Sequence, residues 1–108
     1  MDEINIMALR ELAADKSNVV ISKHAYSRIY ERKISTKDVI SGIASGEIIE
    51  QYPTDFPFPS CLVLGLTSNG EKIHVVCSIG NGALWIISAY IPTLDKWEND
   101  YKTRKAVK

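Results

Sequence analysis

A histidine and two arginines share one face of a predicted helix near the N-terminus. Within residues 22–32, His24, Arg28 and Arg32 are spaced four residues apart. Side chains at this spacing lie above one another on a helix. Arginine binds phosphate oxygens through two parallel hydrogen bonds, and histidine exchanges protons near neutral pH. The group therefore suits phosphodiester chemistry on RNA, although an ordinary solvated helix face has the same pattern.

A second histidine lies in an apolar strand that follows a hairpin turn. The dipeptide Asn-Gly at 69–70 predicts a two-residue loop. That register pairs Gly65 with His74 and leaves open space beside the histidine for a ligand or a partner's side chain. It also puts Cys61 and Cys77 on opposite faces of neighbouring strands, so we expect no disulfide.

The next turn, at residues 80–82, allows two registers. A three-residue loop keeps one face of the sheet apolar, and burial fixes register strongly, so we prefer it to a two-residue loop. The preferred register places His74 beside Ser88 and Lys72 beside Tyr90 on the polar face. These four side chains form a second candidate site; the alternative is a core histidine with a single hydrogen-bond partner.

Hydrophobic spacing predicts the elements that position both groups. Helices segregated from consecutive strands predict an α+β, two-layer domain spanning 1–108, in which the N-terminal helices pack on a four-stranded antiparallel sheet. Helices are predicted over 3–14, over 23–32, from the residue after Ser35 or Thr36 to just before Gly46, and over 93–103; strands are predicted over 18–21, 47–52, 60–68, 71–79 and 83–91.

The C-terminal region carries aromatic and basic side chains. Trp97 and Tyr101 stand one helical turn apart, where they could stack on nucleobases or anchor the last helix to the sheet. The basic residues beyond them are either a solvated tail or further phosphate ligands. They are Lys102, Arg104, Lys105 and Lys108.

Composition restricts the possible functions. The chain has 13 basic and 13 acidic residues, hence zero net charge, which argues against binding nucleic acid by bulk electrostatics. The acidic N-terminus lacks the basic start of a signal peptide, and no apolar run reaches the roughly 18–20 residues that cross a bilayer. The two cysteines fit no close-spaced metal motif. We expect a cytoplasmic protein with reduced cysteines, no membrane association, no metal and no cofactor.

The motifs, taken in order, resemble a family of small bacterial proteins described as a domain of unknown function. The resemblance covers roughly residues 18–104, and the order of the motifs is more specific than any one of them. The motifs are Ser22-x-His24-Ala25-x-x-Arg28, Glu31-Arg32, Gly46-Glu47-Ile48-Ile49, Tyr52-Pro53, Pro59-Ser60-Cys61-Leu62, Gly65, His74-Val75-Val76, Ala89-Tyr90-x-Pro92 and Trp97-Glu98.

Members of that family are often encoded beside proteins with a YgiT-type zinc finger, which is an antitoxin class. The element order also resembles the RelE/BrnT toxin fold. The resemblance therefore implies a toxin of a type II toxin–antitoxin system, with such an antitoxin as partner and RNA, free or on the ribosome, as substrate. This chain differs from RelE-like toxins in charge, because those are strongly basic. The resemblance supports five site residues. The five are His24, Arg28, Arg32, His74 and Tyr90.

The leading hypothesis is a metal-independent endoribonuclease in which the RNA 2′-hydroxyl attacks the adjacent phosphate. One histidine would act as general base, with the other or Tyr90 as acid. Arg28, Arg32 and Lys72 would stabilise the charge that develops on phosphorus. The alternative is a non-catalytic module that binds a protein or a nucleic acid through the proline-rich 53–59 loop and the polar face of the sheet.

Overall fold

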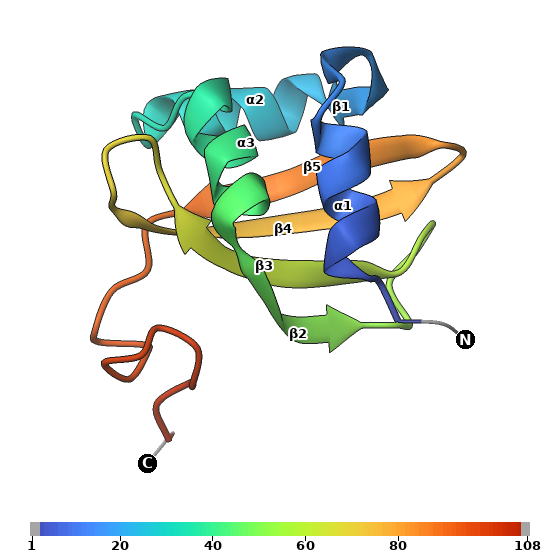
Figure 1. Cartoon of the computed structure of the whole chain (residues 1–108). Coiled ribbons are helices and arrows are strands. Elements are labelled where there is room, and N and C mark those ends of the chain that lie inside the picture. Colours follow the sequence, from blue (N-terminus) through green and yellow to red (C-terminus); the bar gives the residue numbers. More distant parts are fainter. Residues whose placement is uncertain (1–2, 107–108) are drawn as a thin grey trace.

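Three helices cover one face of a five-stranded sheet in the computed structural model, which describes residues 3–106 (Figure 1). The basic residue Lys108 of the predicted tail lies outside the described residues. The helices are α1 (Ile6–Ala13), α2 (Lys23–Glu31) and α3 (Thr36–Ser45), with a short 3-10 turn, η1 (Lys16–Asn18). The strands are β1 (Val19–Ile21), β2 (Glu47–Tyr52), β3 (Ser60–Leu66), β4 (Lys72–Gly80) and β5 (Ala83–Tyr90).

The α+β prediction is confirmed, but the four-stranded antiparallel sheet is wrong. The strand order is β1-β5-β4-β3-β2, and β1 pairs with β5 in parallel. β1 covers only the first half of β5, through Val19↔Leu84 and Ile21↔Ile86. The second half of that edge therefore faces α2, which directly follows β1 in the chain.

Local sequence explains where the helices begin. The Ser22 hydroxyl accepts the backbone N–H of Ala25 at 3.1 Å and so caps α2. Ser35 and Asp38 form the predicted capping box at the start of α3, each side chain accepting the other's backbone N–H. These caps fix the two ends of the short link that joins the helices.

The β3–β4 hairpin differs from the predicted one by a single residue. Thr67 N–H donates to the Glu71 carbonyl at 2.8 Å, so the loop has three residues, and Gly70 adopts the positive φ that such a loop needs. A one-residue slip changes which side chains share a face. Cys61 therefore stands directly opposite Cys77, contrary to expectation.

The two cysteines are buried free thiols whose Sγ atoms lie 4.0 Å apart. The expectation of opposite faces is wrong, whereas the expectation of no disulfide is confirmed. The hydrogen bond with Cys61, together with burial, raises the pKa of the Cys77 thiol well above its ordinary range. Both thiols therefore behave as small core side chains.

Gly65 does not leave a ligand space beside His74, because it faces the helical layer and pairs with Ile73. A Cβ atom built on Gly65 would lie 1.9 Å from the carbonyl oxygen of Gly42 in α3. The backbone of α3 thus packs directly on β3, and glycine is required by this close approach.

The β4–β5 hairpin has a two-residue loop, so the preference for a three-residue loop is wrong. Gly80 pairs with Ala83, and Asn81 and Gly82 both have positive φ, as a tight twisted turn requires. A β-bulge between Val76 and Cys77 then shifts the register. The apolar face stays whole because of this bulge, not because of a longer loop.

The bulge changes the neighbours of the polar face. His74 stands opposite Tyr90, whereas Ser88, which we expected beside it, pairs with Val76. The face toward the helices holds a cluster of buried apolar side chains. Its sheet and helix residues include Leu9, Ile29, Val39, Ile43, Val63, Ile73, Val75, Leu84, Ile86 and Ala89.

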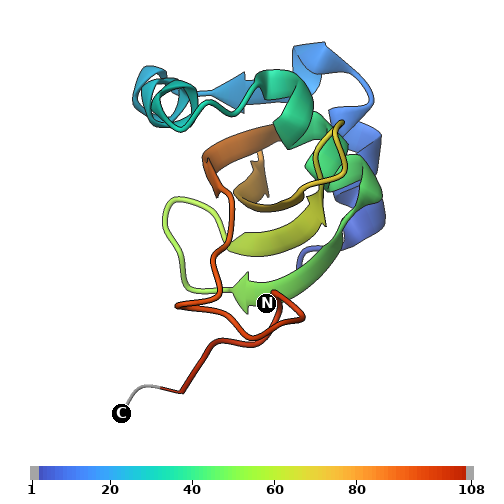
Figure 2. The ribbon, with the colours of Figure 1, turned by 90° about the vertical axis from the view of Figure 1, so that its left-hand side faces the viewer.

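The predicted helix over 93–103 is absent, and an irregular segment crosses the second face of the sheet instead (Figure 2). Asp100 accepts hydrogen bonds from the backbone N–H groups of Lys102 and Thr103, which removes donors that a helix needs. Tyr101 has positive φ, and an isolated bridge joins Trp97 to Arg104. Within residues 3–106 no helix is long and apolar enough to cross a bilayer.

Candidate functional site

His74 lies at the centre of the second face and is completely buried. Its Nε2 is 2.7 Å from the backbone carbonyl oxygen of Tyr101, and its Nδ1 is 3.2 Å from the Tyr90 hydroxyl. A carbonyl oxygen can only accept, so Nε2 carries a proton and donates it. In the neutral ring Nδ1 then accepts from the Tyr90 hydroxyl, and this contact orients that hydroxyl.

A stack of side chains holds the C-terminal segment over His74. The Trp97 ring meets the histidine edge to face at a centroid distance of 4.5 Å, and the Arg104 guanidinium carbon lies 4.7 Å from the centre of the Trp97 ring. Arg104 also donates to both carboxylate oxygens of Glu50 in β2, at 2.8 and 3.0 Å. The segment is thereby attached to the sheet although it lacks regular structure.

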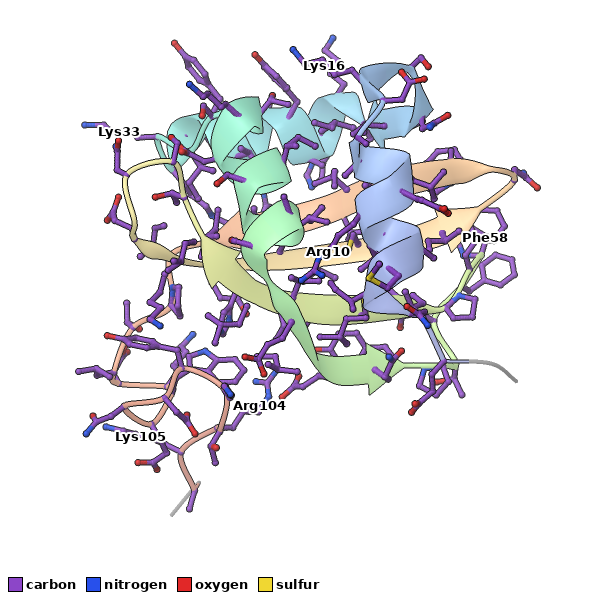
Figure 3. The ribbon with its side chains drawn as sticks, viewed as in Figure 1. Arg10, Lys16, Lys33, Phe58, Arg104 and Lys105 are labelled. Carbon is purple, nitrogen blue, oxygen red and sulfur yellow. The ribbon has the colours of Figure 1, made fainter. Side chains whose placement is uncertain are left out.

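A cleft of about 520 Å³ lies between this segment, the end of β5 and the end of α2. Tyr90 lines it, with the cationic side chains of Arg32, Lys96 and Arg104 and the carboxylate of Asp95. Figure 3 shows Arg104 among the crowded side chains where the C-terminal segment meets the lower strands. The cleft is therefore a polar, mainly cationic site with one tyrosine in its lining.

Arg32 reaches the cleft from the end of α2. Its Nη1 donates to the Ala89 carbonyl at 2.9 Å and to the Ser88 hydroxyl at 3.3 Å. The Ala89 carbonyl is available because β1 ends at Ile21 and leaves that part of the β5 edge unpaired. Burial of Ala25 and Ile29 fixes the helix against the sheet and directs Arg32 over its edge.

Burial controls the proton affinities of the central pair. It lowers the pKa of His74, against the raising effects of the Tyr101 carbonyl and the Glu50 carboxylate. Burial also raises the pKa of Tyr90, and the positive charges of Arg104 and Arg32 oppose this. Both side chains are thus neutral at neutral pH, with arginines placed to stabilise a negative charge on the tyrosine oxygen.

A second hydrogen-bonded group supports the first. The Tyr52 hydroxyl donates to the same Glu50 carboxylate that Arg104 binds. The hydrogen bonds from Arg104 lower the pKa of Glu50, whereas burial and Glu50 raise the pKa of Tyr52 to about 12. Glu50 is therefore a carboxylate over the whole physiological pH range, and it keeps Arg104 in place.

The structure brings together three of the six predicted site residues. Arg32 and Tyr90 line the cleft, and His74 lies directly behind Tyr90. The other three side chains are exposed and do not line it. They are His24 and Arg28 on α2 and Lys72 at the start of β4.

Sequence reasoning singled out Trp97, Tyr101 and Arg104 but missed two contributors. Lys96 shows no local motif, and Glu50 lies 54 residues before the arginine that it binds. A polar residue in the alternating pattern of an edge strand carries no sequence signal that identifies a partner so far along the chain. Within residues 3–106 no three histidine, cysteine, aspartate or glutamate side chains converge as ligands for a metal ion.

Comparison with known proteins identifies a family without a known activity. The family model described as "Domain of unknown function (DUF4258)" matches residues 21–91, from β1 to the residue after β5. No curated protein and no solved structure matches the chain. The matched region contains Arg32, His74 and Tyr90, whereas Lys96, Trp97 and Arg104 lie beyond it.

Proposed function

The chain belongs to the DUF4258 family, and we propose that its C-terminal cleft is the active site of an endoribonuclease that acts as the toxin of a type II toxin–antitoxin system. One observation carries the proposal: Tyr90, whose hydroxyl bonds to a buried neutral histidine, lines a cleft with three cationic side chains and one carboxylate. A hydroxyl with a fixed proton acceptor behind it and cations beside it is suited to proton transfer at a phosphodiester.

In the proposed reaction, the RNA 2′-hydroxyl gives its proton to the Tyr90 oxygen while the Tyr90 proton passes to His74 Nδ1. The 2′-oxygen then attacks phosphorus, and the bond to the 5′-oxygen breaks. The products are a 2′,3′-cyclic phosphate and a 5′-hydroxyl. The Lys96 ammonium supplies the proton to the leaving oxygen. His74 then returns its proton through Tyr90 to the solvent, and Lys96 takes up a proton from the solvent, so that both groups regain their starting states.

The buried environment supports a transient charge on the histidine. When His74 takes up a proton, Nε2 still donates to the Tyr101 carbonyl, and the Glu50 carboxylate stabilises the cation. Arg32 and Arg104 are placed to bind the phosphate oxygens, on which negative charge increases in the transition state. This assignment replaces the predicted roles of Arg28 and Lys72, which are exposed outside the cleft.

His24 and Arg28 keep a role as binding residues in this proposal. Helix geometry puts His24 about 12 Å from Arg32 along α2, which is too far for one phosphate to contact both. The stripe from His24 through Arg28 to Arg32 instead suits successive phosphates of one RNA strand as it approaches the cleft. A local stripe of this kind does not require the whole chain to be basic.

The toxin assignment also rests on the resemblance of the element order to the RelE/BrnT toxin fold, and on the family resemblance, which implies a YgiT-type zinc-finger antitoxin as partner. In that fold, helices pack on one face of an antiparallel sheet. Here β2 to β5 form the antiparallel part, and β1 adds a short parallel strand. The cleft is formed on the second face, which is covered by the irregular C-terminal segment and not by helices.

The experiment is RNA cleavage by purified protein, with and without ribosomes and in the presence of a chelator, together with growth after induced expression. Tyr90→Phe keeps the ring and removes the hydroxyl, so we expect cleavage to fall about 100-fold or more and growth inhibition to be lost. Tyr26→Phe is the matched control, because its exposed ring lies outside the cleft. The cyclic phosphate is the diagnostic product.

A non-catalytic nucleic-acid-binding module is the second candidate. The complete burial of His74, with both ring nitrogens bonded within the protein, is what favours it. In that case RNA binds but stays intact under every condition, and Tyr90→Phe inhibits growth as strongly as the natural chain. Those two results together would reject the nuclease.

A further inference from the structure

Residues 93–105, which we call the C-terminal loop, are held together by their own hydrogen bonds. The Lys105 N–H donates to the Lys96 carbonyl at 3.0 Å, and the Glu98 N–H donates to the Thr103 carbonyl at 2.8 Å. The aspartate hydrogen bonds described above close the tip. Figure 1 shows the result as a closed loop beyond the end of β5. The loop is therefore a small folded unit in its own right.

The C-terminal loop has no main-chain connection to the sheet other than the chain itself. Among the described residues, no backbone–backbone hydrogen bond joins the loop to a strand. Residues 91 and 92 link it to β5, and Pro92 has no N–H group to donate. The loop can therefore leave the sheet without breaking its own hydrogen bonds or any strand pairing.

Few side chains dock the C-terminal loop. Trp97, which is 3% exposed, is the only buried residue within 93–105. Arg104 and Lys102 form ion pairs with two glutamates of β2, but their side chains are 60% and 46% exposed. Exposed ion pairs contribute little, so docking depends mainly on one indole ring. Units with so few buried contacts open at a lower free energy than the core does.

The complete burial of His74 depends on the C-terminal loop. Its Nε2 bonds to the Tyr101 carbonyl, and the Trp97 ring lies 4.5 Å from the imidazole ring, so both contacts belong to the loop. Lys96 and Arg104, which line the cleft, belong to it as well. Undocking would therefore expose the Nε2 edge to water and remove two of the three cations from the cleft.

We propose that the C-terminal loop docks on the second face and leaves it as one unit, turning about residues 91–92, and so controls access to His74. Docking builds the cleft and supplies the carbonyl that fixes the histidine tautomer; undocking dismantles both. The family match ends at residue 91, so the domain shared with the family carries the histidine and the loop beyond it acts as a lid.

The test compares the labelling rates of the two histidines in the full-length chain. Diethyl pyrocarbonate acylates accessible neutral imidazole, and mass spectrometry of peptides gives each rate. His24 is exposed and serves as the internal reference. If the undocked state is populated at about 0.1–10%, His74 should react about 10- to 1,000-fold more slowly than His24. Because the measurement uses no RNA, its result is independent of the nuclease proposal.

Urea separates undocking from global unfolding. Undocking exposes little surface, so the labelling rate of His74 should hardly change at low urea concentrations. Labelling through global unfolding instead rises steeply with urea from the first addition. A His74 rate that follows the global unfolding curve throughout would overturn the proposal.

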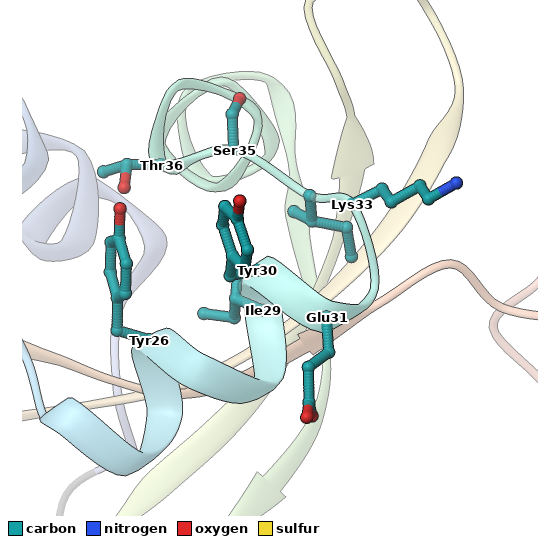
Figure 4. Close-up of a pocket in the computed structure, with 8 residues that line it drawn as sticks. Tyr26, Ile29, Tyr30, Glu31, Lys33, Ser35 and Thr36 are labelled. Carbon is teal, nitrogen blue, oxygen red and sulfur yellow. The ribbon is translucent and has the colours of Figure 1, made fainter.

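Tryptophan variants locate the docking contact. Trp97→Ala removes the buried ring, so His74 should react about tenfold faster or more. Trp85→Ala removes the other tryptophan, which packs on Phe58 and does not line the cleft, and should leave the rate in the absence of urea unchanged. Tyr30→Ala removes an aromatic ring that faces α3 (Figure 4) and should also have no effect.

A milder variant keeps the proposal testable if Trp97→Ala does not fold. Glu50→Gln keeps the shape of the side chain but removes the charge that binds Arg104, so His74 should react about fivefold faster. Glu11→Gln, at an exposed carboxylate of α1, should have no effect. Unchanged labelling of His74 in the folded loop variants, or equal acceleration in Trp85→Ala, would reject the docking equilibrium.

Discussion

The two faces of the sheet are covered in different ways. On the helical face, Ile73, Val75 and Ala89 pack against α-helices in a cluster of buried apolar side chains. On the second face, His74 and Tyr90 from the same two strands lie under an irregular segment and bond to its backbone and to each other. Neighbouring residues of one strand thus enter an apolar core or a polar site according to their face alone.

This difference explains why the polar side chains of the candidate site lie on the second face. A helix satisfies its own backbone hydrogen bonds, so α3 meets the sheet through side chains and through close packing at Gly42, without offering free carbonyl groups. An irregular segment leaves carbonyl groups available, and the Tyr101 carbonyl fixes the tautomer of His74. The helical face should therefore govern stability, and the second face should govern the orientation of polar groups.

The largest expected effect is a clash on the helical face. Gly65→Ala places Cβ 1.9 Å from the Gly42 carbonyl oxygen, so α3 has to move away from the sheet. We expect the free energy of unfolding in urea to fall by about 3 kcal/mol or more.

Gly80→Ala is the matched change on the second face. Its Cβ would lie 2.3 Å from the ring of Phe58, which is a loop side chain and not the backbone of a helix. We expect a cost within about 1 kcal/mol, partly offset by lower backbone entropy in the unfolded chain. Similar losses in the two variants would show that the covers are equally rigid and would break the comparison.

The second prediction concerns the pH dependence of stability. Burial keeps the pKa of folded His74 below its ordinary value of 6.5, so the unfolded chain takes up a proton first as pH falls. The free energy of unfolding contributed by this group is therefore constant above pH 6.5 and falls below it, by at most about 1.4 kcal/mol per pH unit.

Urea titrations from pH 8 down to about pH 5 measure this slope. His74→Gln keeps one donor and one acceptor but does not titrate, so the slope should flatten. His24→Gln removes an exposed histidine and should leave the slope as in the natural chain. If the slope flattens with His24→Gln instead, the pH dependence does not come from neutral His74 in its buried pair with Tyr90.

Much of the fold follows from local rules in the sequence. The capping residues Ser22, Ser35 and Asp38 set helix starts that the structure confirms. The register of the sheet could not be obtained in the same way, since a three-residue loop and a bulge each shift the pairing by one residue. Packing across the sheet decides whether Asn-Gly closes a two-residue or a three-residue loop. The evidence is the close approach of Gly65 to Gly42.

The candidate site was only partly predictable for a related reason. Arg32, His74 and Tyr90 are recognisable by residue type, and α2 brings Arg32 to the strand edge as helix periodicity predicts. The contacts of Glu50 with Arg104 join a strand to a segment with no regular period. No pattern in the sequence predicts the path of that segment, and therefore none predicts the cleft.

The smallest expected effect tests whether the stack on the second face holds that path. Arg104→Lys keeps the charge but loses the two-point contact with Glu50 and the planar stacking on Trp97, so we expect the free energy of unfolding to fall by about 1 kcal/mol. Lys102→Ala removes a single ion pair with Glu47 at 3.1 Å, in which both side chains are about half exposed, and should cost about 0.5 kcal/mol or less. Urea unfolding of both variants at low salt gives the difference. If Arg104→Lys costs no more than Lys102→Ala, the stack does not fix the segment, and the geometry around Tyr90 then depends on the backbone contact to His74 alone.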